Sequence, residues 1–306
     1  MNLYTISKYK YICFILRFKI YYSLRFFLKL GIIENFIRLC KKLHGGAKNF
    51  DESIGLNALS NINTRTKIIS SIAVFSALYG VMRLVPLGPM IGLPAYFSVS
   101  DSLAPLYGIL LGPFTGGMSI IIGTVLGWLM GKPVSFLGLD FLPALVNTVA
   151  IGFLIKRKWA PVVVLNIVLL LAFVLNPLTT LFFGPVPFVW LHIVALLVLV
   201  SPLGRNTGRW VETLKPKFLI AGLAILAFVG TMMQHLTGNI LTEVVLGQVV
   251  GSISPETFSI IIWPSAFLLY PWERLALIII SIVVGVPLVR TLKKSVLPFQ
   301  KQPSQK

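Results

Sequence analysis

Charged residues are scarce in this sequence: they make up 12% of its 306 residues, and only nine of them are acidic. A soluble domain carries roughly a quarter of charged residues, so this chain has about half the usual share. Hydrophobic residues account for 56% of the chain. Several apolar runs reach the ~20 residues that one helix needs to cross a bilayer. The sequence therefore predicts an all-α, polytopic transmembrane helix bundle.

Residues that commonly bind metals or perform catalysis are also few. The sequence has three His and two Cys, and both Cys lie in the basic N-terminal segment, which makes a disulfide framework unlikely to be the basis of the fold. His192 has no second His or Cys at metal-ligand spacing, so we expect no metal site. His-Glu-x-x-His, a Walker phosphate loop and Gly-x-Ser-x-Gly are all absent from the sequence. We expect no cofactor and no enzymatic activity, and any ATP hydrolysis must then occur on a partner chain.

The net charge of +18 could indicate nucleic-acid binding, but the distribution of the cations argues against it. Twelve of the 27 Lys and Arg residues precede position 68, and most of the others lie at the ends of apolar runs. Basic loops of membrane proteins stay on the cytoplasmic side, so we predict that both termini are cytoplasmic. The cations at helix ends are Lys156, Arg157, Lys158, Arg205, Arg209, Lys215, Lys217, Arg290, Lys293 and Lys294.

The sequence divides into three predicted segments. Residues 1–64 form a basic leader and polar linker, 65–294 the transmembrane domain, and 295–306 a cytoplasmic tail. The apolar stretch 11–33 of the leader carries four cations, each of which costs about 2.5–3.5 kcal/mol at a bilayer centre. It is therefore predicted either to lie flat on the anionic inner leaflet or to be a poorly ordered leader, and whether it belongs to the mature protein stays open.

Apolar runs predict the transmembrane helices. The run 258–270 is interrupted by Pro264 and Pro271, so we predict that it is re-entrant or interfacial. About eight crossings then place 24 of the 27 cations in the cytoplasm, and the exceptions are Arg83, Lys132 and Arg274. Seven or nine crossings remain alternatives. The predicted helices are 67–85, 99–111, 115–131, 141–155, 160–182, 188–203, 218–236 and 274–290.

Small residues form the clearest local pattern. Ser70, Ala73, Ala77 and Gly80 recur at three- and four-residue spacing, so they share one face of a helix. Small residues allow helices to approach closely in lipid, where apolar burial contributes little to association. The glycines that recur every four residues, for which we favour packing within the chain, are Gly108, Gly112, Gly116, Gly123, Gly127 and Gly131.

Three stretches resemble the substrate-binding (S) subunits of energy-coupling factor (ECF) importers. They are Ile72–Gly80, Ser100–Leu106 and Gly108–Gly117, and the resemblance covers about residues 66–158. In that family an Ala-x-x-x-Ala face on the first helix docks on a transmembrane scaffold subunit, which is linked to two cytoplasmic ATPases. Ala73 and Ala77 match this motif. The present chain differs in having more predicted helices and a long basic leader.

Polar residues near the outer helix ends are candidates for ligand binding, because an ionisable group at membrane depth is costly unless it is paired or faces a water-filled cavity. We predict a pocket formed by the 86–101 loop with the 131–141 and 235–257 connections. Acids outnumber cations there, which favours a neutral or cationic ligand. Asp101 is equally well explained as a helix cap. The candidates are Tyr96, Ser98, Asp101, Asp140, Gln234, His235 and Asn239.

The resemblance implies a membrane subunit that captures a vitamin or similar micronutrient in a prokaryotic cell membrane, with scaffold, ATPase and lipid partners and no nucleic acid. A self-contained secondary carrier or channel is the alternative. A third possibility is an intramembrane enzyme acting on lipids, for which Glu243 with His235 and Asn239 is a loose candidate cluster. Asn147 and Asn176, predicted within helices, are expected to donate interhelical hydrogen bonds.

The cation distribution leads to a test of topology. Reporters fused at residues 90, 157, 210, 245 and 306 should report outside, inside, inside, outside and inside, because basic segments resist translocation. An external C-terminus would contradict the predicted orientation.

Overall fold

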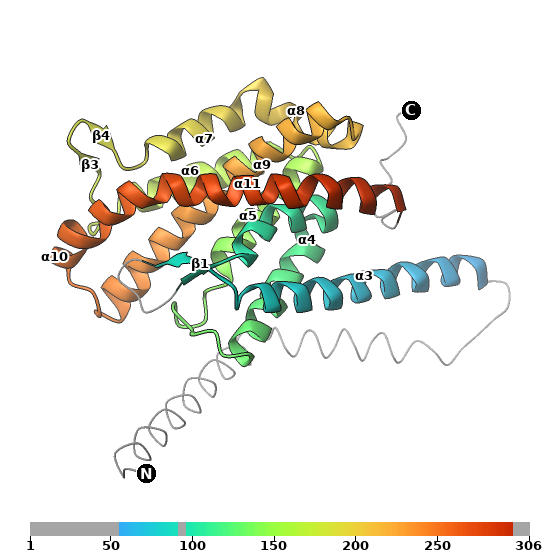
Figure 1. Cartoon of the computed structure of the whole chain (residues 1–306), viewed down its shortest axis with the longest axis horizontal. Coiled ribbons are helices and arrows are strands. Elements are labelled where there is room, and N and C mark those ends of the chain that lie inside the picture. Colours follow the sequence, from blue (N-terminus) through green and yellow to red (C-terminus); the bar gives the residue numbers. More distant parts are fainter. Residues whose placement is uncertain (1–54, 91–95, 296–306) are drawn as a thin grey trace, which may run out of the picture. The chain divides into compact units, whose positions relative to one another are not determined.

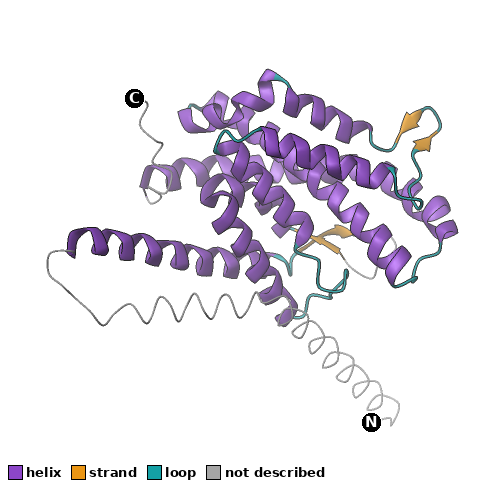
Figure 2. Cartoon of the chain, turned by 180° about the vertical axis from the view of Figure 1, so that it is seen from behind, coloured by secondary structure: helices purple, strands orange, loops and turns teal. Residues whose placement is uncertain are grey.

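The computed structural model describes residues 55–90 and 96–295 of the chain. The chain divides into two compact units, Met1–Arg65 and Thr66–Lys306. Most of the described part is helical, as Figure 2 shows, so the all-α prediction is confirmed at this level. The amphipathic leader stretch and the tail from residue 296 lie outside the described residues. Residues 55–64, predicted as a polar linker, instead form the first turns of a helix.

The helices follow one another along the chain with short connections (Figure 1). Two short antiparallel strand pairs interrupt them, β1 (Pro86–Pro89) with β2 (Tyr96–Ser98) and β3 (Phe182–Phe183) with β4 (Val186–Pro187). The α-helices are α3 (Gly55–Met82), α4 (Ser100–Leu129), α5 (Leu142–Ile155), α6 (Ala160–Val174), α7 (Trp190–Val200), α8 (Pro202–Thr213), α9 (Pro216–Leu241), α10 (Pro255–Thr257) and α11 (Trp263–Ser295). The π-helices are η3 (Thr242–Val249), which continues α9, and η4 (Phe258–Ile262), which joins α10 to α11.

Three stretches of helix are long and apolar enough to cross a membrane within the described part of the chain: Ser100–Leu129, Pro216–Val249 and Pro255–Leu292. The pair α7 and α8, bent by 67°, counts as a fourth if it forms one span. This judgement rests on length and composition. The helices are compatible with a membrane protein, while the eight crossings and the cytoplasmic termini stay predictions.

A break at Gly112 divides α4 into two shorter helices. The φ angle of Gly112 is 79°, in the region that glycine adopts readily, and Pro113 supplies no backbone N–H to continue the helix. A Cβ at Gly116 would lie 2.8 Å from the backbone oxygen of Tyr107, so the chain turns back on itself here. This agrees with the break between the helices predicted over 99–111 and 115–131.

Several element boundaries differ from the prediction. The helix expected over 160–182 ends at Val174. Asn176 lies in the turn that follows, where its side-chain oxygen accepts a hydrogen bond from the backbone N–H of Leu178, so it is not a donor within a helix. The segment 205–217 was expected to be a connection but contains most of α8.

The segment 258–270, predicted to be re-entrant or interfacial, is not separated from the helix that follows it. It joins the following run in one helical stretch from Pro255 to Leu292. Pro264 and Pro271 both lie within this helical stretch, Pro264 shortly after the π-helix η4 and Pro271 inside α11. In membrane proteins, a proline within a helix leaves a backbone carbonyl without its usual hydrogen bond, and groups on neighbouring helices can supply the missing partner.

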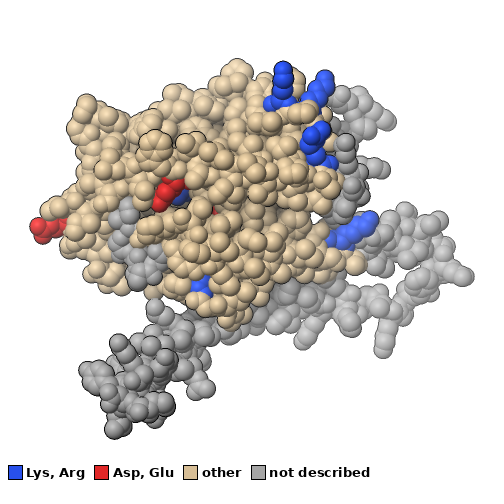
Figure 3. All heavy atoms as spheres, in the orientation of Figure 1, with Lys and Arg blue, Asp and Glu red and all other residues tan. Residues whose placement is uncertain are grey.

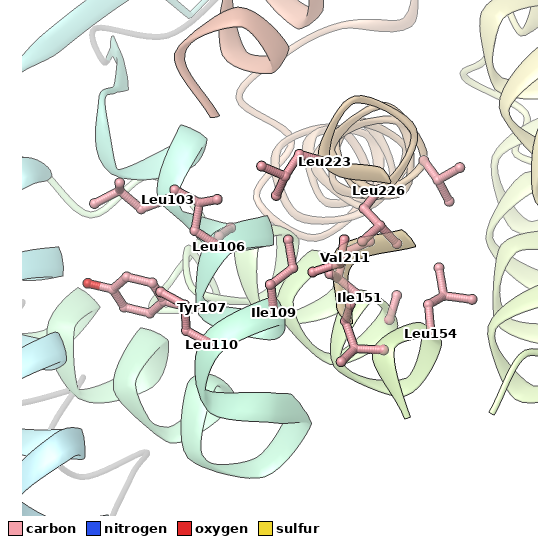
Figure 4. Close-up of a cluster of buried hydrophobic side chains, with 14 of the residues drawn as sticks. Leu103, Leu106, Tyr107, Ile109, Leu110, Ile151, Leu154, Val211, Leu223 and Leu226 are labelled. Atoms are coloured by element: carbon pink, nitrogen blue, oxygen red, sulfur yellow. The ribbon is translucent and has the colours of Figure 1, made fainter. Parts of the chain in front are cut away.

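The main apolar core lies where α4, α5, α8 and α9 meet (Figure 4). Tyr107 on α4 also packs edge-on against Phe75 of α3, at 5.2 Å between ring centroids, and donates a hydrogen bond to the backbone oxygen of that residue. Labelled side chains in Figure 4 that meet in this core include Leu106, Ile109, Ile151, Val211, Leu223 and Leu226.

Glycine packing between α3 and α4 can be tested with a pair of variants. A Cβ at Gly123 would lie 2.8 Å from both the backbone oxygen of Ser76 and Cβ of Tyr79, so Gly123→Ala should lower stability by about 1–3 kcal/mol. Gly238→Ala is the matched control, since a Cβ there meets nothing within 4 Å and alanine favours helix. Thermal unfolding in detergent measures both. A Gly123→Ala protein that melts at or above the wild-type temperature would contradict the packing argument.

Candidate ligand-binding site

A cavity of about 120 Å³ lies among the β1–β2 strands, the start of α4, the 130–141 connection, the end of α9 and the segment η4–α11. These are largely the loops in which a pocket was predicted, with η4 and α11 as additions. Of the seven candidate residues, six contribute to its lining: Tyr96, Asp101, Asp140, Gln234, His235 and Asn239.

Ser98 does not line the cavity but supports it from behind. It is fully buried, and its backbone N–H donates to the Asp101 carboxylate at 2.9 Å. Its hydroxyl lies 3.3 Å from the same carboxylate and 2.8 Å from the hydroxyl of Ser100. Asp101 therefore holds the turn that precedes α4.

A chain of hydrogen bonds links Asp101 to two other helices. The side-chain amide of Gln234 on α9 donates to Asp101 at 3.0 Å, and its oxygen accepts from the amide of Asn147 on α5 at 2.7 Å. Gly230, one turn before Gln234, leaves room for the Asn147 side chain, which a Cβ would meet. The interhelical role predicted for Asn147 is confirmed, and the chain fixes one wall of the cavity.

Asp140 closes the connection between α4 and α5. Its two carboxylate oxygens accept hydrogen bonds from the backbone N–H groups of Ser135, at 2.9 Å, and Phe136, at 3.3 Å. Like Asp101, it already has donors within the protein.

Three cations lie in the cavity lining beside these acids: Arg83, Lys132 and Arg274. Arg83 and Arg274 are 4% and 2% exposed. The Lys132 ammonium donates to the backbone oxygen of Tyr96 at 3.1 Å and lies 4.4 Å from the centroid of the Tyr96 ring. None of the three was among the seven predicted residues. A signal was nevertheless present, because they are the three cations that departed from the cytoplasmic distribution.

The α11 helix adds residues that the sequence analysis missed. The Arg274 guanidinium lies 5.3 Å from the Phe97 ring centroid and 3.5 Å from the Glu273 carboxylate. Tyr270 stacks on His235, with ring centroids 4.8 Å apart and an angle of 19° between the rings. His235 thus belongs to an aromatic wall of the cavity.

Behind this wall, His235 is hydrogen-bonded to His192, with 3.1 Å between the facing ring nitrogens. No group of three or more metal-binding side chains occurs among the residues that the structure describes. The pair alone offers fewer ligands than a structural or catalytic metal site requires.

The charge balance of the lining differs from the expectation. Asp101, Asp140 and Glu273 face three cations, so acids are not in excess. Glu243 is absent from the lining, and its carboxylate accepts a hydrogen bond from Thr179 at 2.5 Å. The proposed cluster of Glu243 with His235 and Asn239 is therefore not assembled around this cavity.

Comparison with known proteins identifies one distant relative. No family model matches the chain, and no solved structure does. An uncharacterized protein of Methanocaldococcus jannaschii is 28% identical over 159 residues, which are 51% of this chain and 52% of the relative. The chain thus matches about half the length of this curated relative, and the likeness assigns no ligand.

The connection that carries Lys132 leads to a pH prediction. Burial lowers the pKa of Lys132 from 10.5 to about 8, although the nearby Asp101 and Asp140 oppose this and Arg83 adds to it. The folded state therefore binds fewer protons than the unfolded state between about pH 8 and 10.5. Stability should rise with pH across this window relative to Lys132→Met, which lacks the titrating group. Melting temperatures in detergent across the window measure the difference.

The exposed Lys156 provides the control. Lys156→Met should leave the pH dependence of melting as it is in the wild type. A Lys132→Met protein with the wild-type slope would show that the ammonium is not buried as the structure has it.

Proposed function

We propose that the chain is the substrate-capture subunit of an ECF-type importer in a prokaryotic cell membrane, with a scaffold subunit and ATPases as partners. The observation that carries the proposal is the cavity, which gathers sparse polar side chains at one end of the helices, opposite the basic end. A subunit that captures a small molecule outside the cell and hydrolyses no ATP requires such a site.

The two ends can be told apart by the reversal in α4. The Gly112 turn lies beside Lys156, with 3.8 Å from a Cβ at Gly112 to the Lys156 ammonium. The opposite ends of the same two helices, near Asp101 and Lys132, line the cavity. On the face shown in Figure 3, several Lys and Arg side chains lie near α8 and the end of α11, and acidic atoms lie near α10. The positive-inside rule then puts the basic end in the cytoplasm and the cavity outside.

The predicted docking face on α3 divides into two parts. Ser70, Ala73 and Ala77 are exposed, next to Val74, which is 65% exposed. Gly80 is buried: a Cβ there would lie 3.0 Å from Cβ of Leu126 on α4, so this residue serves packing within the chain. We retain the three exposed residues as the docking face and remove Gly80 from it.

A self-contained carrier is the second candidate function. The observation in its favour is the set of polar groups buried within helices, namely the pair His192–His235 and Glu243. Ionisable residues of this kind often mark ion or proton pathways in membrane proteins. A carrier would transport its substrate in vesicles that contain this chain alone, whereas the capture subunit would not.

The docking face provides the test. Ala73→Leu with Ala77→Leu should spare folding and ligand binding, because both residues are exposed. The same double variant should abolish co-purification of a scaffold subunit and uptake of the ligand. Expression, ligand retention and co-purification would be measured on the same double variant. Ala160→Leu with Ala172→Leu, at two exposed positions of α6, is the matched control for added bulk.

Wild-type uptake and an unchanged complex in the α3 double variant would reject the docking assignment. Loss of folding would instead show that the face of α3 with Ala73 and Ala77 also packs within this chain.

A further inference from the structure

The hydrogen-bonding capacity of the cavity lining is unevenly used. Three lining residues have a buried side-chain nitrogen without a hydrogen-bond partner among the described residues: Nε of Arg83, Nε of Arg274 and Nδ2 of Asn239. All three are N–H donors. The exposed fractions of these residues are 4%, 2% and 8%, so bulk water does not reach them freely. An unsatisfied buried donor costs about 1–3 kcal/mol, more for a charged group.

Two of the three acids of the lining, Asp101 and Asp140, are in the opposite condition. Asp101 accepts hydrogen bonds from Ser98 and Gln234, and Asp140 accepts two from backbone N–H groups. Glu273 lies 3.5 Å from Arg274, a long contact that leaves the guanidinium Nε free of it. Asp101 and Asp140 are thus occupied as acceptors, whereas three lining N–H groups have no partner among the described residues, so the cavity is prepared for a ligand that accepts hydrogen bonds.

The remaining lining restricts the shape of that ligand. Tyr270 and His235 are stacked, and Phe136 and Trp263 complete a largely aromatic wall. A volume of about 120 Å³ is slightly smaller than an apolar cavity of roughly 150 Å³ that accommodates benzene. The volume limits the enclosed part of a ligand to about one flat ring, and because the cavity is partly open to the outside, the whole ligand need not be enclosed.

We propose that the cavity binds a small, flat carboxylate, whose oxygens accept hydrogen bonds from Arg274, Arg83 and Asn239 while its apolar face lies against Tyr270 and His235. A planar guanidinium matches a carboxylate better than an ammonium does. This rests on the proposed function, because it names the class of molecule captured at that site. It replaces the neutral or cationic ligand expected from the loop sequences.

The test uses the full-length protein in mild detergent, with benzoate as the probe. Benzoate should raise the melting temperature and bind measurably by calorimetry, whereas its neutral isostere benzamide should bind at least tenfold more weakly. Inorganic phosphate, an anion without a flat apolar face, should also bind at least tenfold more weakly. These comparisons need no variant and therefore do not depend on how a substitution affects folding.

Substitutions in the cavity lining then test whether benzoate binds at this site. Arg274→Gln should weaken benzoate binding at least tenfold, and Arg274→Lys should recover part of it, since lysine keeps the charge and loses the planar donor geometry. Arg83→Gln is a second variant on a different element, in the turn that follows α3. Arg290→Gln is the control, because Arg290 is exposed on the same helix as Arg274.

Equal binding of benzoate and benzamide would overturn the proposal, as would benzoate binding that survives both Arg274→Gln and Arg83→Gln. Stronger binding of phosphate than benzoate would assign the donors to a different anion and reject the flat carboxylate. None of these outcomes would reject the capture function, which is decided separately by scaffold co-purification and uptake. If benzoate binds as expected but no scaffold subunit co-purifies, the capture function would be rejected and the carboxylate site would stand.

Discussion

The hydrogen-bond chain from Asp101 through Gln234 to Asn147 is the interaction on which the site depends. It ties the start of α4 to α5, the next helix along the chain, and to α9, which is far from both in the sequence. In a low-dielectric interior an unpaired amide or carboxylate is costly, so the three side chains hold one relative arrangement of their helices. The cavity lies directly beside this chain, and Asp101 and Gln234 belong to both. The same residues thus hold one wall of the cavity in place and contribute polar atoms to its lining.

Close helix packing complements that chain. Apolar burial contributes little between helices in lipid, so contact must come from backbones that approach closely. Gly116 lets the two parts of α4 meet after the Gly112 turn, and Gly123 brings α4 against α3. Because α4 reverses, both of its outer ends reach the cavity, one carrying Asp101 and the other leading to Lys132. A straight helix of the same length would put these two residues at opposite ends.

The sequence contained much of this arrangement in local signals. The separate helices predicted over 99–111 and 115–131 anticipated the break in α4, and sparse polar residues near the outer helix ends predicted six of the residues that line the cavity. The contribution of α11 was not predictable in the same way, because Pro264 and Pro271 suggested breaks where the helix continues. The inward orientation of Gly80 was also hidden, since one face of small residues serves equally for packing inside the chain and for a partner. Only the position of α4 decides between the two.

The charge of the cavity lining has to be described by its hydrogen-bond partners as well as by the number of charged groups. The relevant cations are Arg83, Lys132 and Arg274. As exceptions to the cytoplasmic distribution they are costly at membrane depth, and three acids in the same lining offset that cost. Formal neutrality keeps the site tolerable in a low-dielectric environment. Asp101 and Asp140, however, accept hydrogen bonds from backbone and amide donors, whereas Arg83 and Arg274 each keep a buried N–H without a partner among the described residues. A site can therefore have no net charge and still favour a ligand that accepts hydrogen bonds. Net charge depends only on the number of charged groups, whereas hydrogen bonding depends on their geometry.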